Sequence, residues 1–263
     1  YGRLGGIPAE LLTVPASELA FYDIETTGLA RGPGTTVLLV GMGRVCSKET
    51  SAFAWLEIRQ WFAVDFPGER QLLEQFAEKL EDVGVLVGYN CGSFDWPVLQ
   101  SKAVMNGVQL PQPRQLDLLR PSRRLFGLEL PNCRLHTIEE SVLGVKRGLD
   151  VPGSEVPERY FAFTDSGDID GMLPVFAHHQ QDIRSLYELL QYMRYTANVA
   201  AVSARATGGA TGGDSLPVLE RETAAVDGSV TVRWDPVGIA ELISAAGGDP
   251  LPILEQGTAV LLR

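Results

Sequence analysis

A short apolar run limits the folds open to this chain more than any other stretch of it. Gly84-Val85-Leu86-Val87-Gly88 carries no polar side chain, and runs of this kind are typical of strands buried on both faces of a mixed or parallel sheet. It stands between two stretches with helical patterns, residues 67–80 and 95–105. A helix, a buried strand and a second helix in this order predict an α/β layer fold.

Three β-rich segments come before that run, at residues 18–25, 35–45 and 51–58. Short polar or glycine-containing links join them, which favours an antiparallel meander. After the run we expect a short apolar strand near residues 116–119 and helices over 135–143 and 173–196. The predicted fold class is therefore α/β, a mixed β-sheet of three antiparallel strands followed by parallel strands, flanked by helices.

Composition divides the chain into four parts. Residues 1–17 form an entry arm, and residues 18–202 form the main domain. Residues 203–215 (SARATGGATGGDS) form a Gly-rich linker. Residues 216–263 form a small C-terminal α/β segment of unknown role, with expected strands at 229–234 and 258–262 and a helix at 236–246.

The composition is that of a soluble globular protein. Of 263 residues, 45% are hydrophobic and 21% are charged, and the mean hydropathy is +0.04. No apolar run is long enough to span a membrane, and no signal peptide is visible. The three widely spaced cysteines form neither a disulfide framework nor a zinc motif. We therefore expect a cytoplasmic protein without a membrane partner.

The net charge of −11 argues against a nucleic-acid partner at first sight. A metal-dependent nuclease, however, carries acidic residues at its centre and offsets them with cations. Within residues 114–147, seven Lys or Arg residues face four Asp or Glu residues. This locally basic segment is either a solvated face or a track for phosphates.

Two carboxylates lie at the end of the first expected strand. Side chains alternate along a strand, so Asp23 and Glu25 point to the same side while Ile24 points into the core. Adjacent like charges contribute nothing to packing, and a divalent cation between them is the usual reason for such a pair. Taken alone, an Asp-x-Glu pair is more often a solvated strand end that begins a turn.

Two further carboxylates occur in suggestive positions. Asp95 follows the buried strand and opens a helix, where open α/β sheets bind ligands; the alternative is an ordinary N-cap. Asp182 lies four residues after His178, so the two share one helix face. His179 is rotated by roughly 100° from that face, and the alternative for His178 is a solvated surface residue.

Together these fragments resemble the DEDD exonuclease superfamily, whose fold is ribonuclease-H-like. Asp-x-Glu, Asn-x-x-x-Phe-Asp and His-x-x-x-Asp occur in the family's order. The resemblance is closer still to the YprB-like branch and spans about residues 18–195. Its further motifs are Leu116-Asp117-Leu118-Leu119-Arg120, Leu135-His136-Thr137-Ile138-Glu139, Leu143-Gly144-Val145-Lys146-Arg147 and Asp150-Val151-Pro152-Gly153.

The resemblance implies a site with two Mg²⁺ or Mn²⁺ ions held by four carboxylates, Asp23, Glu25, Asp95 and Asp182. It also implies a proton acceptor beside Asp182. Related enzymes place a tyrosine four residues, or a histidine five residues, before the last aspartate. Here position five is Ala177, and His178 occupies the tyrosine position. We expect His178 to orient or deprotonate the attacking water.

Other residues are expected to receive the terminal nucleotide. By resemblance these are Thr26, Thr27, Gly28 and Leu29, which follow the first two acidic residues, with Asn90 and Phe94 shaping the site. Asp117 is expected either near the metals or in a pair with Arg114 or Arg120. His136 is expected to be structural, and Trp96 and Tyr22 are expected in the core.

The predicted function is a metal-dependent 3′–5′ exonuclease that hydrolyses phosphodiester bonds of single-stranded DNA or RNA. One alternative is a structure-selective endonuclease of the same fold. Another is a catalytically weak nucleic-acid-binding module, against which the four intact acidic positions argue.

Overall fold

The structure is a computed structural model that describes residues 3–4, 7–28, 34–47, 54–148, 150–206 and 253–262. Its strands are β1 (Arg3–Leu4), β2 (Ile7–Pro8), β3 (Leu19–Thr26), β4 (Val37–Ser47), β5 (Ala54–Ala63), β6 (Val85–Gly88), β7 (Arg114–Asp117) and β8 (Ile253–Leu262). Its α-helices are α1 (Ala9–Leu12), α2 (Gly68–Leu80), α3 (Asp95–Asn106), α4 (Leu119–Phe126), α5 (Leu135–Ile138), α6 (Val156–Ser166) and α7 (Leu173–Ala206). Short 3₁₀ turns lie at Ala16–Glu18, Gly153–Glu155 and Asp170–Met172, and a π-helical turn covers Glu139–Leu143.

The main sheet is mixed and has the strand order β7-β6-β3-β4-β5-β8. Strand β3 pairs antiparallel with β4, and β4 pairs antiparallel with β5. On its other side β3 pairs parallel with β6, and β6 pairs parallel with β7. This arrangement confirms the predicted fold class, three antiparallel strands followed by parallel strands.

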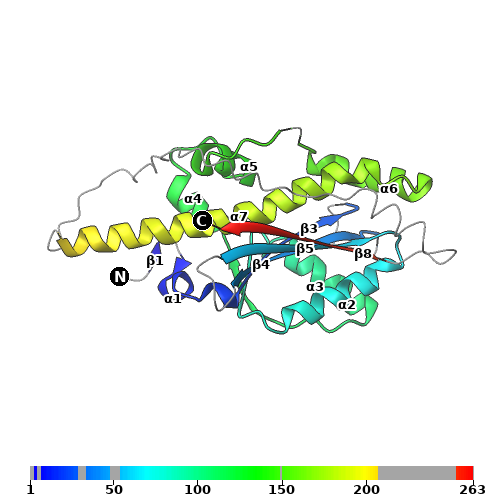
Figure 1. The fold of residues 1–263 in the computed structure, drawn as a ribbon, viewed down its shortest axis with the longest axis horizontal. Coiled ribbons are helices and arrows are strands. Elements are labelled where there is room, and N and C mark those ends of the chain that lie inside the picture. The colour runs from blue at the N-terminus through cyan, green and yellow to red at the C-terminus, as the bar shows by residue number, and fades with distance from the viewer. Residues whose placement is uncertain are drawn as a thin grey trace.

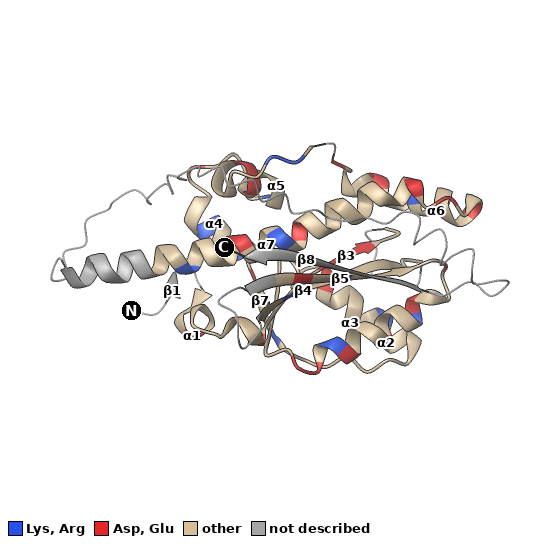
Figure 2. Ribbon diagram, viewed as in Figure 1, with Lys and Arg blue, Asp and Glu red and all other residues tan. Residues whose placement is uncertain are grey.

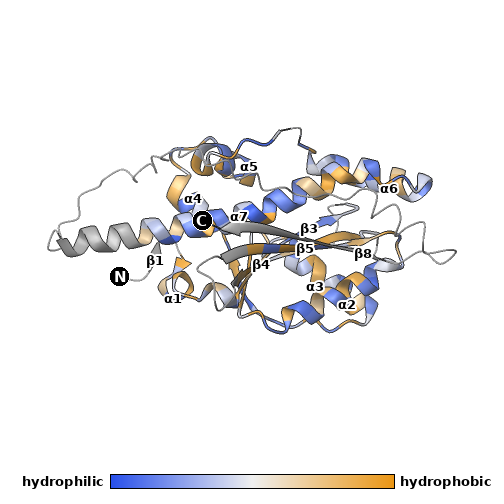
Figure 3. Cartoon of the chain, viewed as in Figure 1, coloured by the Kyte–Doolittle hydropathy of each residue, from blue (hydrophilic) through white to orange (hydrophobic). Residues whose placement is uncertain are grey.

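Helices cover both faces of the sheet (Figure 1). Helices α2 and α3 lie on one face, where Leu72, Leu73 and Phe76 of α2 are fully buried. Helix α7 crosses the other face, with α4, α5 and α6 beyond it. In Figure 3 the apolar residues follow the strands, while the helices alternate between apolar and polar sides. The burial of one stripe of each helix against the sheet supplies most of the core.

Helix α7 approaches the sheet closely because β4 has glycines beneath it. A Cβ atom added at Gly41 would lie 2.3 Å from Ile183 Cδ1 and 2.4 Å from His179 Cε1. One added at Gly43 would lie 2.8 Å from Ile183 Cγ2. Real Cβ atoms do not tolerate such distances, so the two glycines set the distance between α7 and the sheet.

Several boundaries differ from the sequence-based expectation. Strand β5 continues to Ala63, five residues beyond the strand expected at residues 51–58. Helices α4 and α6 were not predicted individually. Helix α7 runs to Ala206, so the first four residues of the expected linker are helical. A long amphipathic helix continues through Ser and Ala residues because neither is a strong helix breaker.

The two ends of the chain also contact the main sheet. Ile7 and Leu11 of the entry arm are buried in the core beneath α7. Strand β8 pairs antiparallel with β5 from Ala63↔Ile253 to Ala54↔Leu262, and it includes the last strand expected from the sequence. The remaining expected linker, strand and helix, at residues 207–215, 229–234 and 236–246, lie outside the described residues. Within the described ranges, no helix is both long and apolar enough to cross a membrane.

Candidate active site

The first two predicted ligands lie at the carboxyl end of β3, in the middle of the sheet. Asp23 and Glu25 are partly buried, and Ile24 between them is buried in the core on the opposite face. The pairing of β3 with β4 shifts register between Glu25 and Thr26. Bulges of this kind often occur next to active sites, where they redirect a side chain.

Asp95 reaches the same edge of the sheet from the start of α3. It is the first residue of the helix, follows Phe94 at the N-cap position, and is 9% exposed. The N-cap alternative is therefore wrong for Asp95. The preceding loop turns at Asn90, which adopts a left-handed conformation with φ 57°. Asparagine tolerates this conformation better than most residues.

Helix α7 contributes the last two residues. His178 and Asp182 lie one turn apart, and His178 Nε2 is 3.4 Å from Asp182 Oδ2. The side chains are mostly buried, with exposed fractions of 14% and 17%. The spacing read from the sequence thus places both groups on the same side of the helix.

The carboxylates of Asp95 and Asp182 lie close enough to those of Asp23 and Glu25 to raise their pKa values. Burial raises the pKa of Asp23 well above its usual range, and the charges of Asp182, Asp95 and Glu25 raise it further. Burial, with the charges of Asp182 and Asp95, raises the pKa of Glu25 to about 8. Burial is also the main cause that raises the pKa of Asp95 to about 7. Residues far apart in the sequence therefore share one acidic site.

Arg147 balances part of this charge. Its guanidinium donates to Asp182 Oδ1 and binds Glu139 with two hydrogen bonds of 2.7 and 2.6 Å. The Glu139 side chain is completely buried, the Arg147 side chain is 6% exposed, and Ser185 also donates to Glu139. Burial raises the pKa of Asp182, although the nearby charges of His178 and Arg147 oppose this effect.

The charge and donor type of this site fit a divalent cation. Four buried or partly buried carboxylates with raised pKa values are the oxygen ligands that Mg²⁺ and Mn²⁺ prefer, and one arginine does not neutralise all of them. In the part of the chain that the structure describes, no three His, Cys, Asp or Glu side chains are arranged so that they could hold an ion as they stand. The pairing of Asp182 with Arg147 turns one carboxylate oxygen towards the guanidinium.

His179 has a different role from His178. It is completely buried, Nε2 donates to the backbone carbonyl oxygen of Asp23 at 3.0 Å, and Nδ1 accepts from Gln60 Nε2 at 2.8 Å. Burial lowers the pKa of His179 to about 3, so the ring is neutral. Gln60 also donates to the carbonyl oxygen of Phe176. The sequence indicated only that His179 faces away from His178.

Of the residues expected to bind the terminal nucleotide, Thr26 and Thr27 directly follow Glu25 and lie beside the acidic site. Thr26 Oγ1 donates to the carbonyl oxygen of Gly28 at 2.7 Å, and Thr27 Oγ1 accepts from the amide of Thr36 at 2.9 Å. The Thr27 amide donates to the Thr36 carbonyl oxygen, so it is already engaged within the turn. Leu29 lies outside the described residues.

Phe94 is partly buried and packs against the core beneath α2 and α3. Tyr22 and Trp96 are core residues, as expected, with exposed fractions of 1% and 8%. His136 is exposed near Glu139 and Glu140.

Asp117 forms no ion pair with Arg114 or Arg120 in the described part of the chain, but its charge raises the pKa of Asp95, so it lies near the acidic site. Its carboxylate accepts hydrogen bonds from the backbone amides of Asn90 (2.8 Å), Gly92 (3.3 Å) and Leu119 (2.9 Å). It thereby fixes the loop that leads to Asp95. No local signal reveals this role, because the loop and Asp117 are brought together only by the parallel pairing of β6 with β7.

The basic segment divides into two parts. Arg147 is buried among carboxylates and does not belong to a surface track. The other six basic residues are exposed, and Figure 2 shows basic residues on α4 and on the chain that leads from α5 towards α6. They are Arg114, Arg120, Arg123, Arg124, Arg134 and Lys146.

Comparison with known proteins agrees with this fold. Residues 20–194 match a family model described as RNase_H superfamily. The chain is 32% identical over 180 residues to "Uncharacterized protein YprB" of Bacillus subtilis (strain 168), a match that covers 67% of this chain and 42% of that protein. The chain therefore spans less than half of this relative's length.

One solved structure shows the same fold, and a second is a weaker match. The family B DNA polymerase of the archaeon Pyrobaculum calidifontis matches with a TM-score of 0.51 and 20% identity, over 68% of this chain and 25% of the polymerase chain. Escherichia coli Exonuclease I in complex with a dA16 oligonucleotide matches with a TM-score of 0.36 and 18% identity, over 57% of this chain and 41% of the exonuclease chain. By its sequence match, this chain belongs to the RNase_H superfamily.

Proposed function

We propose that this chain is a metal-dependent 3′–5′ exonuclease of the DEDD type that hydrolyses phosphodiester bonds in single-stranded DNA or RNA. One observation carries the proposal. Four carboxylates from β3, α3 and α7 share one edge of the sheet, where the charges of Asp95 and Asp182 raise the pKa values of Asp23 and Glu25. A protein keeps such a repulsive cluster when cations neutralise it.

Asp23, Glu25, Asp95 and Asp182 would hold two Mg²⁺ or Mn²⁺ ions. Bound there, the ions would lower the pKa of a water molecule and stabilise the charge that develops on the leaving 3′-oxygen. Oxygen-only ligands suit these hard cations rather than zinc or copper.

His178 would accept the proton of the attacking water at Nε2. This nitrogen faces Asp182, so it points towards the proposed ligands. The water oxygen then bonds to phosphorus as the bond from phosphorus to the 3′-oxygen breaks. A histidine is suited to this transfer because its ordinary pKa is close to neutral pH.

The 3′–5′ direction of hydrolysis and the choice of a single-stranded 3′ end as substrate are inferred from the resemblance of the motifs. The turn after Glu25 (Thr26, Thr27, Gly28 and Leu29), together with Asn90 and Phe94, would receive the terminal nucleotide. The exposed basic residues of α4 and its neighbours are suited to the phosphates of the remaining strand.

A gel assay with 5′-labelled DNA and RNA oligonucleotides tests the proposal in the presence of Mg²⁺, Mn²⁺ or EDTA. We expect a ladder of products shortened from the 3′ end that requires the metal and is lost in Asp23→Asn and Asp182→Asn. Asp82→Asn, at an exposed position beyond α2, serves as the matched control and should retain activity. If neither polymer is shortened in a metal-dependent way, the exonuclease proposal is wrong.

The same assay separates the alternatives. Cleavage of a circular single strand would indicate an endonuclease, because a circle has no 3′ end. Binding of the oligonucleotide without cleavage in any metal would indicate a binding module.

A further inference from the structure

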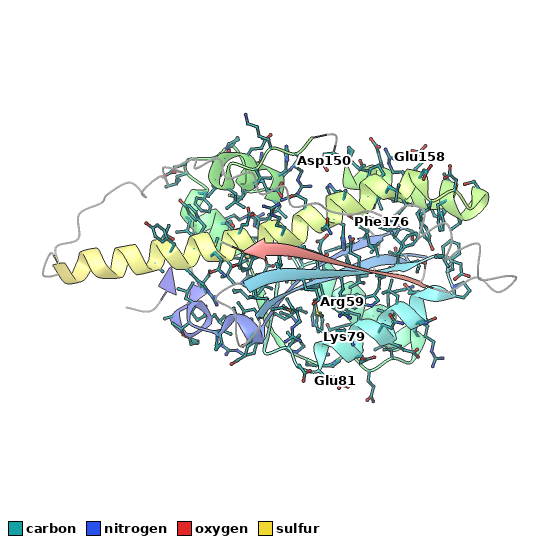
Figure 4. All side chains as sticks on the ribbon, in the orientation of Figure 1. Arg59, Lys79, Glu81, Asp150, Glu158 and Phe176 are labelled. Atoms are coloured by element: carbon teal, nitrogen blue, oxygen red, sulfur yellow. The ribbon has the colours of Figure 1, made fainter. Side chains whose placement is uncertain are left out.

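The imidazole of His178 lies between two carboxylates. Nδ1 is 2.6 Å from Asp150 Oδ1, and Nε2 is 3.4 Å from Asp182 Oδ2. Asp150 lies on the segment between the π-helical turn and α6, and Figure 4 shows it on the α5 and α6 side of α7. The two ring nitrogens therefore face different environments, one towards this segment and the other towards the acidic site.

Asp150 is itself held in place by its neighbours. Its Oδ1 accepts from the backbone amide of Val151 at 3.1 Å, and its Oδ2 accepts from Arg147 Nη1 at 3.3 Å. Val151 is 3% exposed and packs in the core cluster that includes Val156 of α6. The Asp150 carboxylate is thus held by the backbone amide of the buried Val151 and by the guanidinium of Arg147.

The donors around His178 determine which nitrogen carries the proton. Arg147 Nη1 is 2.9 Å from His178 Nδ1, but a guanidinium only donates hydrogen bonds. An ionised Asp150 only accepts them. At 2.6 Å the contact with Asp150 is the shorter one, so Nδ1–H donates to Asp150 and the contact between Arg147 and His178 is not a hydrogen bond. In the neutral ring this leaves the lone pair on Nε2.

We propose that Asp150 is a positioning residue that holds His178 in the Nδ1–H tautomer, with the Nε2 lone pair directed at the acidic site. The inference rests on the proposed function, in which Nε2 accepts the proton of the attacking water. Asp150 also stabilises the imidazolium that this transfer creates, because it accepts the hydrogen bond from Nδ1 throughout. In this role Asp150 acts through His178 and not on the substrate.

Replacement of Asp150 by alanine provides a directional test. Without the carboxylate, Arg147 Nη1 becomes the remaining donor beside Nδ1. Nδ1 must then accept, and the proton moves to Nε2, where it blocks proton transfer from water. We expect kcat to fall roughly 10–100-fold with KM little changed, a loss typical of groups that orient a functional histidine.

The tautomer is read by ¹⁵N NMR of histidine-labelled protein with Mg²⁺ at pH 9, where an ordinary imidazole is neutral. Because the chain has three histidines, a His178→Gln spectrum assigns the signals. We expect Nδ1–H in the wild type and Nε2–H in Asp150→Ala. Asp165→Ala, an exposed position on α6, is the matched control and should preserve the wild-type tautomer and kcat.

Two results would overturn the inference. One is an Nε2–H tautomer of His178 in the wild type, and this measurement does not depend on whether any variant folds. The other is an Asp150→Ala protein that keeps both the Nδ1–H tautomer and the wild-type kcat. If the wild type shows no metal-dependent cleavage, the proposed function fails, while the NMR result still decides the contact between Asp150 and His178.

Discussion

His179 on α7 donates a hydrogen bond from Nε2 to the backbone carbonyl oxygen of Asp23 on β3, over a distance of 3.0 Å. The bond joins the strand that carries Asp23 and Glu25 to the helix that carries His178 and Asp182. Gln60 on β5 completes the link, because it donates to His179 Nδ1 and to the carbonyl oxygen of Phe176. One neutral imidazole thereby links β3, β5 and α7.

Replacement of His179 by leucine should destabilise the protein. The substitution removes the donor to Asp23 and leaves an amide hydrogen of the buried Gln60 without its acceptor, at a cost of about 1–3 kcal/mol. Urea denaturation followed by circular dichroism measures the free energy of unfolding. His136→Leu, at an exposed histidine on α5, should change it by less than about 0.5 kcal/mol. Equal losses in the two variants would contradict the proposed link.

Gly41→Ala should also destabilise the contact between β4 and α7. The new Cβ would lie 2.4 Å from His179 Cε1, and the imidazole cannot move aside without breaking its two hydrogen bonds. We expect a loss of about 1–3 kcal/mol, as for other overpacked cores. Thermal unfolding measures this loss. Gly153→Ala, where nothing lies within 4 Å of the added Cβ, is the control and should unfold at the same temperature as the wild type.

Arg147→Met should be more damaging than the loss of an ordinary surface arginine. It leaves the completely buried Glu139 carboxylate without its cationic partner, and breaking a buried pair on one side costs about 3–5 kcal/mol. Arg70 pairs with Glu74 at an exposed position of α2, so Arg70→Met should cost only about 0–1 kcal/mol. Denaturation curves of the two variants test the difference, and similar values would show that Arg147 is not needed to balance Glu139.

Glu25→Gln should stabilise the metal-free protein, and the gain should grow with pH. The pKa of Glu25 is raised to about 8 in the folded state from an ordinary value near 4.5. The folded state therefore binds the proton more tightly, and stability from this group falls as pH rises from about 4.5 to about 8. Glutamine removes this loss, so we expect the variant to be more stable by roughly 2–4 kcal/mol at pH 9 and nearly equal to the wild type at pH 4.5.

Urea denaturation in EDTA at the two pH values measures this gain. Glu81→Gln, at an exposed position after α2, should differ from the wild type by less than about 0.5 kcal/mol at both. Addition of Mg²⁺ at pH 9 should stabilise the wild type, by about 2.7 kcal/mol at 100 times the dissociation constant, and stabilise Glu25→Gln less. A gain from Glu25→Gln that does not depend on pH, or equal stabilisation of both proteins by Mg²⁺, would contradict the acidic metal site.

Local patterns in the sequence determined much of this fold and part of its site. Alternation along β3 places Asp23 and Glu25 on one side of the strand, and the four-residue spacing places His178 beside Asp182. The apolar run at residues 84–88 specified a buried parallel strand, which the structure confirms. The first two features depend on the 2.0- and 3.6-residue periods of strands and helices and the third on an unbroken apolar run, so the sequence carries all of them directly.

The tertiary structure decided which distant residues contact one another around the acidic site. Arg147 looked like one member of a basic surface segment, but it is buried against Glu139 and Asp182, the latter 35 residues away. Asp150 meets His178 across 28 residues, and Gln60 meets His179 across 119. Periodicity says which face of an element a residue occupies but not which distant residue will face it. That depends on how the layers pack, and here the packing gives each histidine its hydrogen-bond partners and gives the acidic site its internal cation.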